Sequence, residues 1–160
     1  MKVIYPGSFD PITYGHLDIL ERATNLFEKV YITIAVNTRK SSIFSPEERS
    51  KLIHETIAEK SWAGKVEIHL FSGLLVDYAQ KNNVKTLLRG VRQFSDYEYE
   101  FRMALMNRKL DNEIDTIFLM PREELTFVSG SLVREIAYWN GDLTHFVPEN
   151  VAKALKEKFS

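Results

Sequence analysis

One histidine of this 160-residue chain stands where a helix that could hold a phosphate group would begin. It is His16, at the end of the stretch PGSFDPITYGH, which follows a short apolar run and contains Gly7 and Gly15. Glycines permit tight turns and a close approach of the main chain to a ligand. The free N–H groups at the start of a helix favour an anion. The stretch therefore suits a bound phosphate, although a plain turn with a histidine near a helix start would also fit.

A pair of cations follows the second apolar run of the chain. Arg39 and Lys40 lie in NTRKSSIF, among small polar residues. Such a pair can bind phosphate oxygens on a loop. The alternative is an ordinary solvated surface, where most charged side chains are found.

Two more cations, Arg89 and Arg92, lie around Gly90 in RGVRQFSDYEYE. Guanidinium groups on a glycine-containing loop suit phosphate, because each can donate two parallel hydrogen bonds to its oxygens. The alternative is an ion pair with one of the acids that follow, which are Asp96, Glu98 and Glu100.

A third kind of anion site is possible at Ser129, Gly130 and Ser131, which lead into a helical pattern in VSGSLVRE. Hydroxyls and free N–H groups at a helix start can surround an anion. Plain N-capping by serine is the alternative. The chain contains no cysteine, no GxxxxGK[ST] loop and no evident Ser-His-Asp set. Many cations without a covalent nucleophile favour phosphoryl or nucleotidyl transfer by positioning and charge stabilisation.

Composition limits the class of protein and its partners. Hydrophobic residues make up 44%, which is typical of a folded globular protein. The net charge of -1 makes nucleic acid an unexpected partner. No apolar run is long enough to cross a membrane, and the start MKVIYPG is too soon broken for a signal peptide. Without cysteine, a cytoplasmic location is expected.

The elements that must position these residues alternate along the chain. Strands are expected at residues 2–5, 30–36, 65–71, 85–89 and 115–120. Helices are expected at residues 16–29, 45–60, 74–83, 96–110, 131–141 and 148–159, with Ser45 and Asp96 as caps.

This alternation predicts an α/β fold in which residues 1–160 form a single domain. Its core would be a Rossmann-like, doubly wound sheet of about five parallel strands with helices on both faces. Ligands of such sheets bind at the carboxyl ends of the strands, where the stretches described above would meet.

Several stretches resemble a known family. Thr13-Tyr14-Gly15-His16 is similar to the [H/T]xGH motif of the nucleotidyltransferase superfamily, and VSGSLVRE resembles its second motif. The blocks LLRGVRQFSDYEYEFRMALMNRKL, IFLMP and THFVPENV resemble the bacterial phosphopantetheine adenylyltransferases. The resemblance covers nearly the whole chain, in order.

The resemblance implies a reversible reaction of coenzyme A biosynthesis. The adenylyl group of ATP passes to 4'-phosphopantetheine, giving dephospho-coenzyme A and pyrophosphate, by direct attack without a covalent enzyme intermediate. It also implies Mg²⁺ as cofactor, a homohexamer and feedback inhibition by coenzyme A.

The resemblance also implies a role for individual residues. His16 would stabilise the transition state, and Lys40 and Arg92 would assist catalysis. The residues implied for 4'-phosphopantetheine are Ser8, Lys40, Leu75 and Arg89. Those implied for ATP are Ser8, Phe9, His16, Gly90, Val91, Arg92, Glu100, Leu125, Thr126, Phe127, Val128, Ser129, Gly130 and Ser131.

The chain departs from the family pattern at a few positions. Gly130 stands where many relatives have serine, Ser8 replaces threonine and Arg134 replaces lysine. Two other hypotheses stay open. One is a sister nucleotidyltransferase that uses nicotinamide mononucleotide as acceptor, or CTP in place of ATP. The other is a nucleotide-binding module without catalysis.

Overall fold

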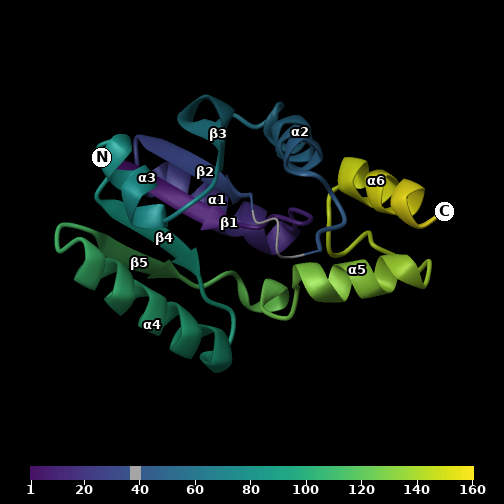
Figure 1. Cartoon of the computed structure of the whole chain (residues 1–160). Coiled ribbons are helices and arrows are strands. Elements are labelled where there is room, and N and C mark those ends of the chain that lie inside the picture. The colour runs from purple at the N-terminus through teal and green to yellow at the C-terminus, as the bar shows by residue number, and fades with distance from the viewer. Residues whose placement is uncertain (37–40) are drawn as a thin grey trace.

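The computed structural model of the chain describes residues 1–36 and 41–160. Within these residues, five parallel strands form one sheet in the order β3-β2-β1-β4-β5 (Figure 1). The strands are β1 (Lys2–Gly7), β2 (Lys29–Ala35), β3 (Val66–Phe71), β4 (Thr86–Gly90) and β5 (Asp115–Leu119). The predicted five-stranded parallel α/β sheet is confirmed.

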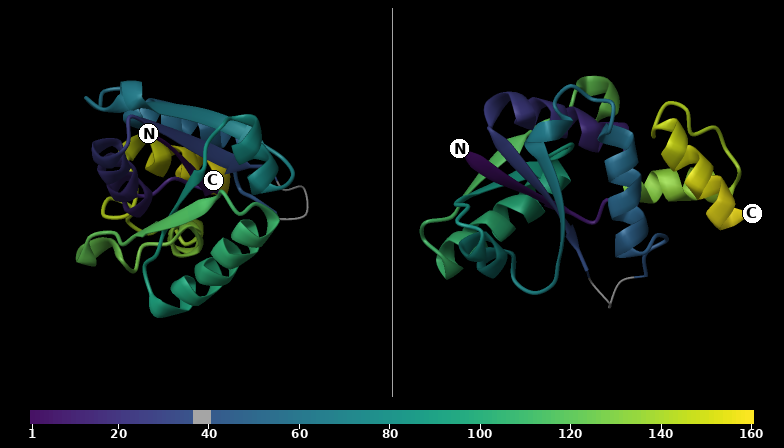
Figure 2. Two further views of the ribbon diagram at one scale, coloured as in Figure 1. Left: turned by 90° about the vertical axis from the view of Figure 1, so that its left-hand side faces the viewer. Right: turned by 90° about the horizontal axis from the view of Figure 1, so that it is seen from above.

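Helices cover both faces of the sheet, as predicted (Figure 2). They are α1 (Tyr14–Leu26), α2 (Pro46–Ile57), α3 (Leu75–Lys81), α4 (Phe94–Leu110), α5 (Gly130–Tyr138) and α6 (Glu149–Phe159). Two 3₁₀ turns, η1 (Ala63–Lys65) and η2 (Glu123–Leu125), are also present. None of the helices in the described part of the chain is both long and apolar enough to cross a membrane.

The core has two layers because neighbouring side chains of a strand point to opposite faces. On one face, Val3 and Ile32 pack in a cluster with side chains of α1 and α2. On the other face, Ile4 and Leu87 pack against Val76 of α3. All five side chains are buried. The central strands β1 and β4 are therefore held from both sides.

Two helices begin two residues earlier than predicted. α1 was expected to begin at His16 but begins at Tyr14, because Thr13 is its N-cap and His16 completes the cap. Asp96 was expected to cap the fourth helix, but α4 begins at Phe94 with Gln93 at the N-cap position. Asp96 instead forms an ion pair with Arg92.

The strand order creates a crevice beside β1. The chain passes from β1 to β2 on one side of β1, and later crosses from β3 to β4, which lies on the other side of β1. Ligands of open α/β sheets bind at such a reversal, outside the carboxyl ends of the strands. In Figure 1, β4 and β5 point toward the start of α5, and α5 and α6 lie side by side beyond the strands.

Candidate active site

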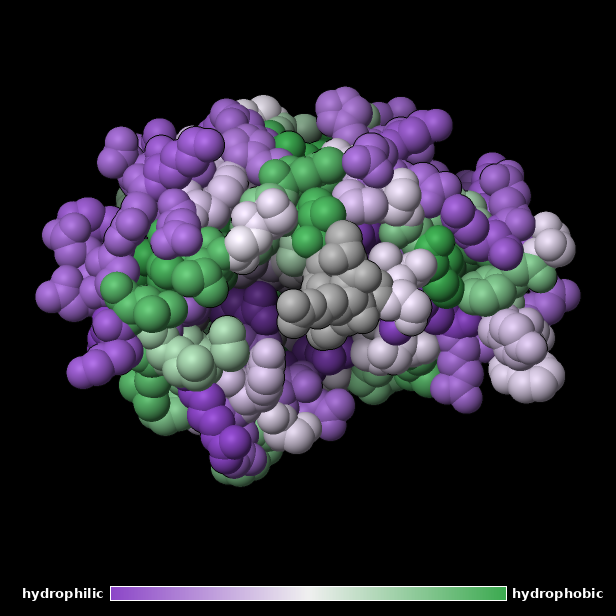
Figure 3. All heavy atoms as spheres, viewed as in Figure 1, coloured by the Kyte–Doolittle hydropathy of each residue, from purple (hydrophilic) through white to green (hydrophobic). Residues whose placement is uncertain are grey.

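A cleft with a volume of about 640 Å³ lies at the carboxyl ends of the strands. A hollow with hydrophilic residues at its base lies near the middle of the face shown in Figure 3. The residues that line the cleft and have a substrate role implied by the resemblance are Ser8, Phe9, His16, Leu75, Arg89, Gly90, Arg92, Glu100, Val128, Ser129, Gly130 and Ser131. Val91, Leu125, Thr126 and Phe127 do not line it. Arg39 and Lys40 lie outside the described residues.

The turn after β1 is shaped by Phe9. Its side chain is only 1% exposed, and its ring packs edge-on against Tyr5 with the centroids 5.3 Å apart. The main chain of Phe9 has a positive φ of 47°, which is uncommon for residues other than glycine. A Cβ atom on Gly7 would lie 2.9 Å from the Phe9 ring. Glycine is therefore required at position 7 by this ring.

Asp10 fastens the same turn to distant parts of the chain. Its carboxylate accepts hydrogen bonds from the main-chain N–H groups of Ile43 and Phe44, at 2.9 and 3.0 Å. Its carbonyl oxygen accepts a hydrogen bond of 2.6 Å from Nη1 of Arg134, on α5. The turn after β1, the start of α5 and the segment that leads into α2 are thus held together.

His16 is part of an unusual capping box. The main-chain N–H of His16 donates to Oγ1 of Thr13 at 3.4 Å, and the main-chain N–H of Thr13 donates to Nδ1 of His16 at 3.0 Å. In the usual capping box, glutamate or glutamine fills this third helical position. Because a main-chain N–H can only donate, Nδ1 must be unprotonated. The neutral ring therefore carries its proton on Nε2.

The surroundings of His16 also favour the neutral ring. Part of its surface is open to the cleft, but neighbouring atoms enclose it closely. The pKa of His16 is lowered from 6.5 to about 4, mainly by this burial and in smaller part by the charges of Arg92 and Arg89. The sequence left the protonation state open; in the structure the ring is neutral at pH 7.

Arg89 has an acidic partner within the protein. Its Nε donates to Oε2 of Glu100 at 2.6 Å, and its Nη2 donates to Oε1 at 2.5 Å. Its Nη1 donates to the carbonyl oxygen of Pro6 at 2.7 Å. The ion pair that the sequence offered as an alternative is therefore formed, and it leaves Arg89 with its charge largely balanced.

Arg92 is held in a similar way. Its Nε donates to Asp96 at 3.2 Å, and its Nη1 donates to the carbonyl oxygen of Val128 at 2.8 Å. These contacts join the loop after β4 to the loop before α5. Arg92 still lines the cleft, so a ligand can approach its guanidinium.

The start of α5 is both capped and crowded. The Ser129 hydroxyl accepts a hydrogen bond of 3.1 Å from the main-chain N–H of Leu132, so the N-capping alternative is present. A Cβ atom on Gly130 would lie 3.3 Å from Nη1 of Arg134 and 3.5 Å from the carbonyl oxygen of Asp10. Glycine at position 130 thus gives room for the bond between Arg134 and Asp10.

Tyr5 and Arg49 are among the residues of the cleft that were not singled out from the sequence. Tyr5 is buried, burial raises the pKa of its hydroxyl, and none of the described residues forms a hydrogen bond with it. Arg49, on α2, is also buried and lines the cleft. Tyr5 ends the predicted first strand, so its position was a usable signal. SPEER indicated only a capped helix start, and nothing in it pointed Arg49 toward the cleft.

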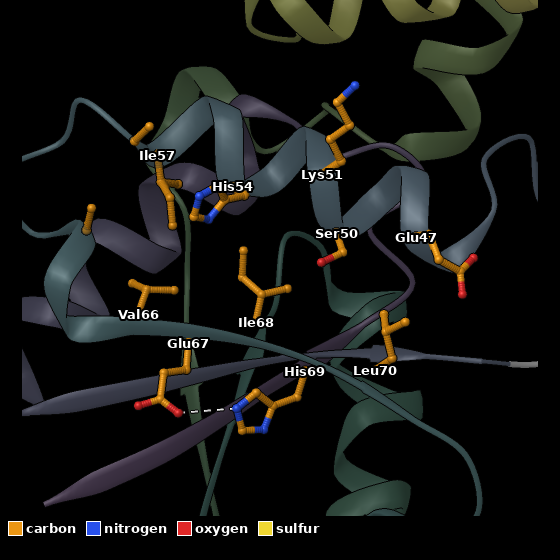
Figure 4. Close-up of a pocket in the computed structure, with 12 residues that line it drawn as sticks. Glu47, Ser50, Lys51, His54, Ile57, Val66, Glu67, Ile68, His69 and Leu70 are labelled. Carbon is orange, nitrogen blue, oxygen red and sulfur yellow. Dashed lines mark hydrogen bonds and ion pairs between the residues drawn. The ribbon is translucent and has the colours of Figure 1, made fainter.

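A second hollow, of about 810 Å³, lies between α2 and the edge strand β3 (Figure 4). Val66 and Ile68 of β3 are on its α2 side, whereas Glu67 and His69 lie on the other side of the strand and contact each other at 3.2 Å. None of the described arginines lines this hollow. The smaller cleft, where four arginines gather, is therefore the candidate active site.

The described residues contain no group of three or more His, Cys, Asp or Glu that could hold a metal ion. Two carboxylates line the cleft, and both already have partners. Asp10 accepts hydrogen bonds from main-chain N–H groups, and Glu100 accepts from Arg89. These side chains do not fit a magnesium site built by the protein alone.

Known nucleotidyltransferases are similar to this chain in sequence pattern and in structure. The model of the cytidylyltransferase-like family matches residues 4–136. A solved structure of a putative nicotinate-nucleotide adenylyltransferase from Vibrio parahaemolyticus is similar, with a TM-score of 0.72 and 15% identity, over 99% of this chain and 93% of that chain. The nicotinic acid mononucleotide adenylyltransferase of Plasmodium falciparum is similar in its complex with NaAD, with a TM-score of 0.74 and 17% identity, over 98% of this chain and 94% of that chain. At such identities the likeness establishes the fold.

Proposed function

The chain belongs to the cytidylyltransferase-like family, and on this premise we propose that it transfers the adenylyl group of ATP to 4'-phosphopantetheine. The products are dephospho-coenzyme A and pyrophosphate. One observation supports nucleotidyl transfer most strongly. Neutral His16, the arginines after β4 and the start of α5 all line the same cleft.

The reaction needs charge stabilisation more than proton transfer. An oxygen of the acceptor phosphate forms a bond to the α-phosphorus of ATP, the bond from that phosphorus to the bridging oxygen breaks, and pyrophosphate leaves. The attacking oxygen is already anionic, so a general base is not required. Neutral His16 would donate its Nε2–H to an oxygen of the α-phosphate as negative charge grows there.

The arginines would hold the two substrates in position. Arg92 is fixed by Asp96 and by the carbonyl oxygen of Val128. A guanidinium that is held in place before the substrate arrives loses little entropy when it binds phosphate. Bringing two polyanions together costs electrostatic energy, and cations beside them reduce that cost.

The choice of 4'-phosphopantetheine as acceptor is supported by the sequence and by the lining of the cleft. The blocks around RGVRQFSDYEYE resemble the phosphopantetheine adenylyltransferases. The lining of the cleft includes apolar side chains, among them Leu75 and the paired residues Ala35 and Phe71, which suits an uncharged, flexible acceptor arm.

The proposal includes Mg²⁺, carried by the phosphates of ATP, where it would neutralise part of their charge. It also includes a homohexamer and inhibition by coenzyme A. Assembly is supported by α4, on which no residue is buried, while Phe94, Tyr99 and Met106 are exposed. Analytical ultracentrifugation tests the hexamer, and a titration of coenzyme A into the assay tests the inhibition.

The experiment that tests the function is pyrophosphate release with a panel of substrates. ATP is combined with 4'-phosphopantetheine, nicotinate mononucleotide or nicotinamide mononucleotide, and CTP replaces ATP in a matched series. We expect release with ATP and 4'-phosphopantetheine to exceed every other pair at least 100-fold in kcat/KM. Preference for a mononucleotide or for CTP would identify a sister enzyme, and binding of ATP without release would indicate a non-catalytic module.

A further inference from the structure

We infer that Arg49 is a further anion-binding residue of this cleft, whose buried guanidinium takes its counter-charge from a substrate phosphate. This inference rests on the proposed function for the identity of the substrates, but the binding of phosphate that it requires can be measured without turnover.

Arg49 is held at two points of the main chain. Its side chain leaves α2, and the residue is only 4% exposed. Nη1 donates to the carbonyl oxygen of Ser8 at 2.7 Å, and Nε donates to the carbonyl oxygen of Ser45 at 3.4 Å. Ser45 is the N-cap of α2. The guanidinium therefore connects the start of this helix to the turn after β1.

The charge of Arg49 is not balanced by an acid. The other three arginines that line the cleft each have a carboxylate nearby, at 2.5 Å for Arg89, 3.2 Å for Arg92 and 4.0 Å for Arg134. Within residues 1–36 and 41–160, no carboxylate lies within 4.0 Å of Arg49. The remaining residues, 37–40, have the sequence NTRK and contain no acid.

A buried charge without a partner is costly, and buried arginines are almost always paired. Two carbonyl oxygens supply hydrogen bonds but only partial negative charge. Because Arg49 lines the cleft, an anion bound there can complete the pair. Guanidinium groups match phosphate oxygens in geometry as well as in charge. A phosphate group is thus the ligand that this environment suits.

Two sources of phosphate are available to the cleft, which are the polyphosphate of the nucleotide and the phosphomonoester of the acceptor. Inorganic pyrophosphate serves as a probe for the first. For the second, 4'-phosphopantetheine is compared with pantetheine, which lacks the phosphate. Binding is measured by titration calorimetry in the absence of ATP, so that no turnover occurs.

Three variants separate charge from packing. Arg49→Met keeps an unbranched apolar side chain without the charge, Arg49→Lys keeps the charge, and Lys51→Met is the control, because Lys51 is exposed on the same helix and does not line the cleft. We expect Arg49→Met to weaken the binding of pyrophosphate or of 4'-phosphopantetheine at least 10-fold while pantetheine binding stays the same. Arg49→Lys should stay within about 3-fold of the wild type, and Lys51→Met should be unchanged.

Equal affinity of the wild type and Arg49→Met for both phosphate ligands would overturn the inference. An equal loss for pantetheine would also overturn it, because packing would then explain the effect. If Arg49→Met does not fold, Arg49→Gln and Arg49→Lys are compared, and equal affinities of these two would overturn it. Should the wild type bind phosphate through Arg49 but never release pyrophosphate from ATP, the proposed function would fail while this inference would stand.

Discussion

The main-chain N–H of Thr13 donates to Nδ1 of His16 at 3.0 Å, so the helix cap and the candidate catalytic ring are one structure. This hydrogen bond fixes the tautomer and the orientation of the imidazole ring. It leaves Nε2 as the nitrogen that carries the proton of the neutral imidazole. The result is a neutral donor beside Arg89 and Arg92, which suits a site where charge develops on phosphate oxygens.

The first prediction concerns stability at low pH. The pKa of His16 is about 4 in the folded chain and 6.5 in the reference state. Between these values the unfolded chain binds the additional proton, so the free energy of unfolding falls as the pH decreases from 6.5 to 4. The contribution of His16 is fully present above pH 6.5 and amounts to roughly 1–3 kcal/mol.

Urea unfolding of the wild type and of His16→Asn, between pH 4 and 7.5, measures this effect. The difference in the free energy of unfolding between the two proteins should change in favour of His16→Asn as the pH falls. A difference that is constant with pH would show that the pKa of His16 is not lowered in the folded chain.

The second prediction concerns the cap itself. Replacing Thr13 by alanine removes the hydroxyl that accepts from the N–H of His16, and this should lower the free energy of unfolding by about 1 kcal/mol. We also expect kcat to fall several-fold, because the ring is less well oriented. Thr13→Ser keeps the hydroxyl and is the matched control. If alanine and serine at this position gave the same kcat, the cap would have no part in orienting His16.

The third prediction concerns the pair between Arg89 and Glu100. The carboxylate of Glu100 balances the charge of Arg89 at 2.5 Å. Glu100→Gln removes the negative charge but keeps the shape, so Arg89 should attract anions more strongly. We expect the Kd for inorganic pyrophosphate to fall about 3- to 10-fold, and the melting temperature to fall as well. Glu98→Gln, on the exposed face of α4, is the control.

The fourth prediction concerns Lys40, whose role is implied by the family resemblance and which lies outside the described residues. Lys40→Ala should raise the KM for 4'-phosphopantetheine at least 10-fold, because the acceptor phosphate loses a cation. The KM for ATP should change much less. An unchanged KM for 4'-phosphopantetheine in steady-state assays would remove Lys40 from the acceptor site.

The sequence was sufficient to predict the sheet and the end of the sheet that holds the cleft. Apolar runs that alternate with helical patterns predict parallel strands. The stretches with glycine, serine and cations follow the carboxyl ends of those strands, where ligands bind. His16 and Gly130 could therefore be placed at one site without knowledge of the packing.

Other features depend on distant contacts and could not be predicted. The helix start at Tyr14 depends on a histidine in a capping position that glutamate usually fills. The pairing of Arg89 with Glu100 depends on how α4 packs beside β5 and α3, which local sequence does not determine. Arg49 was overlooked because SPEER also has a complete explanation as a helix start, with Ser45 and Glu48 forming a capping box.

We propose that neutral His16 stabilises the transition state of adenylyl transfer, and this role is tested by comparing catalysis with ATP binding. kcat with ATP and 4'-phosphopantetheine and the Kd for ATP are measured for the wild type and for His16→Ala. We expect kcat to fall about 100- to 1,000-fold, as for other donors to a developing oxyanion, while the Kd for ATP changes less than about 5-fold. An equal loss in kcat and in ATP affinity, or a kcat close to that of the wild type, would contradict it.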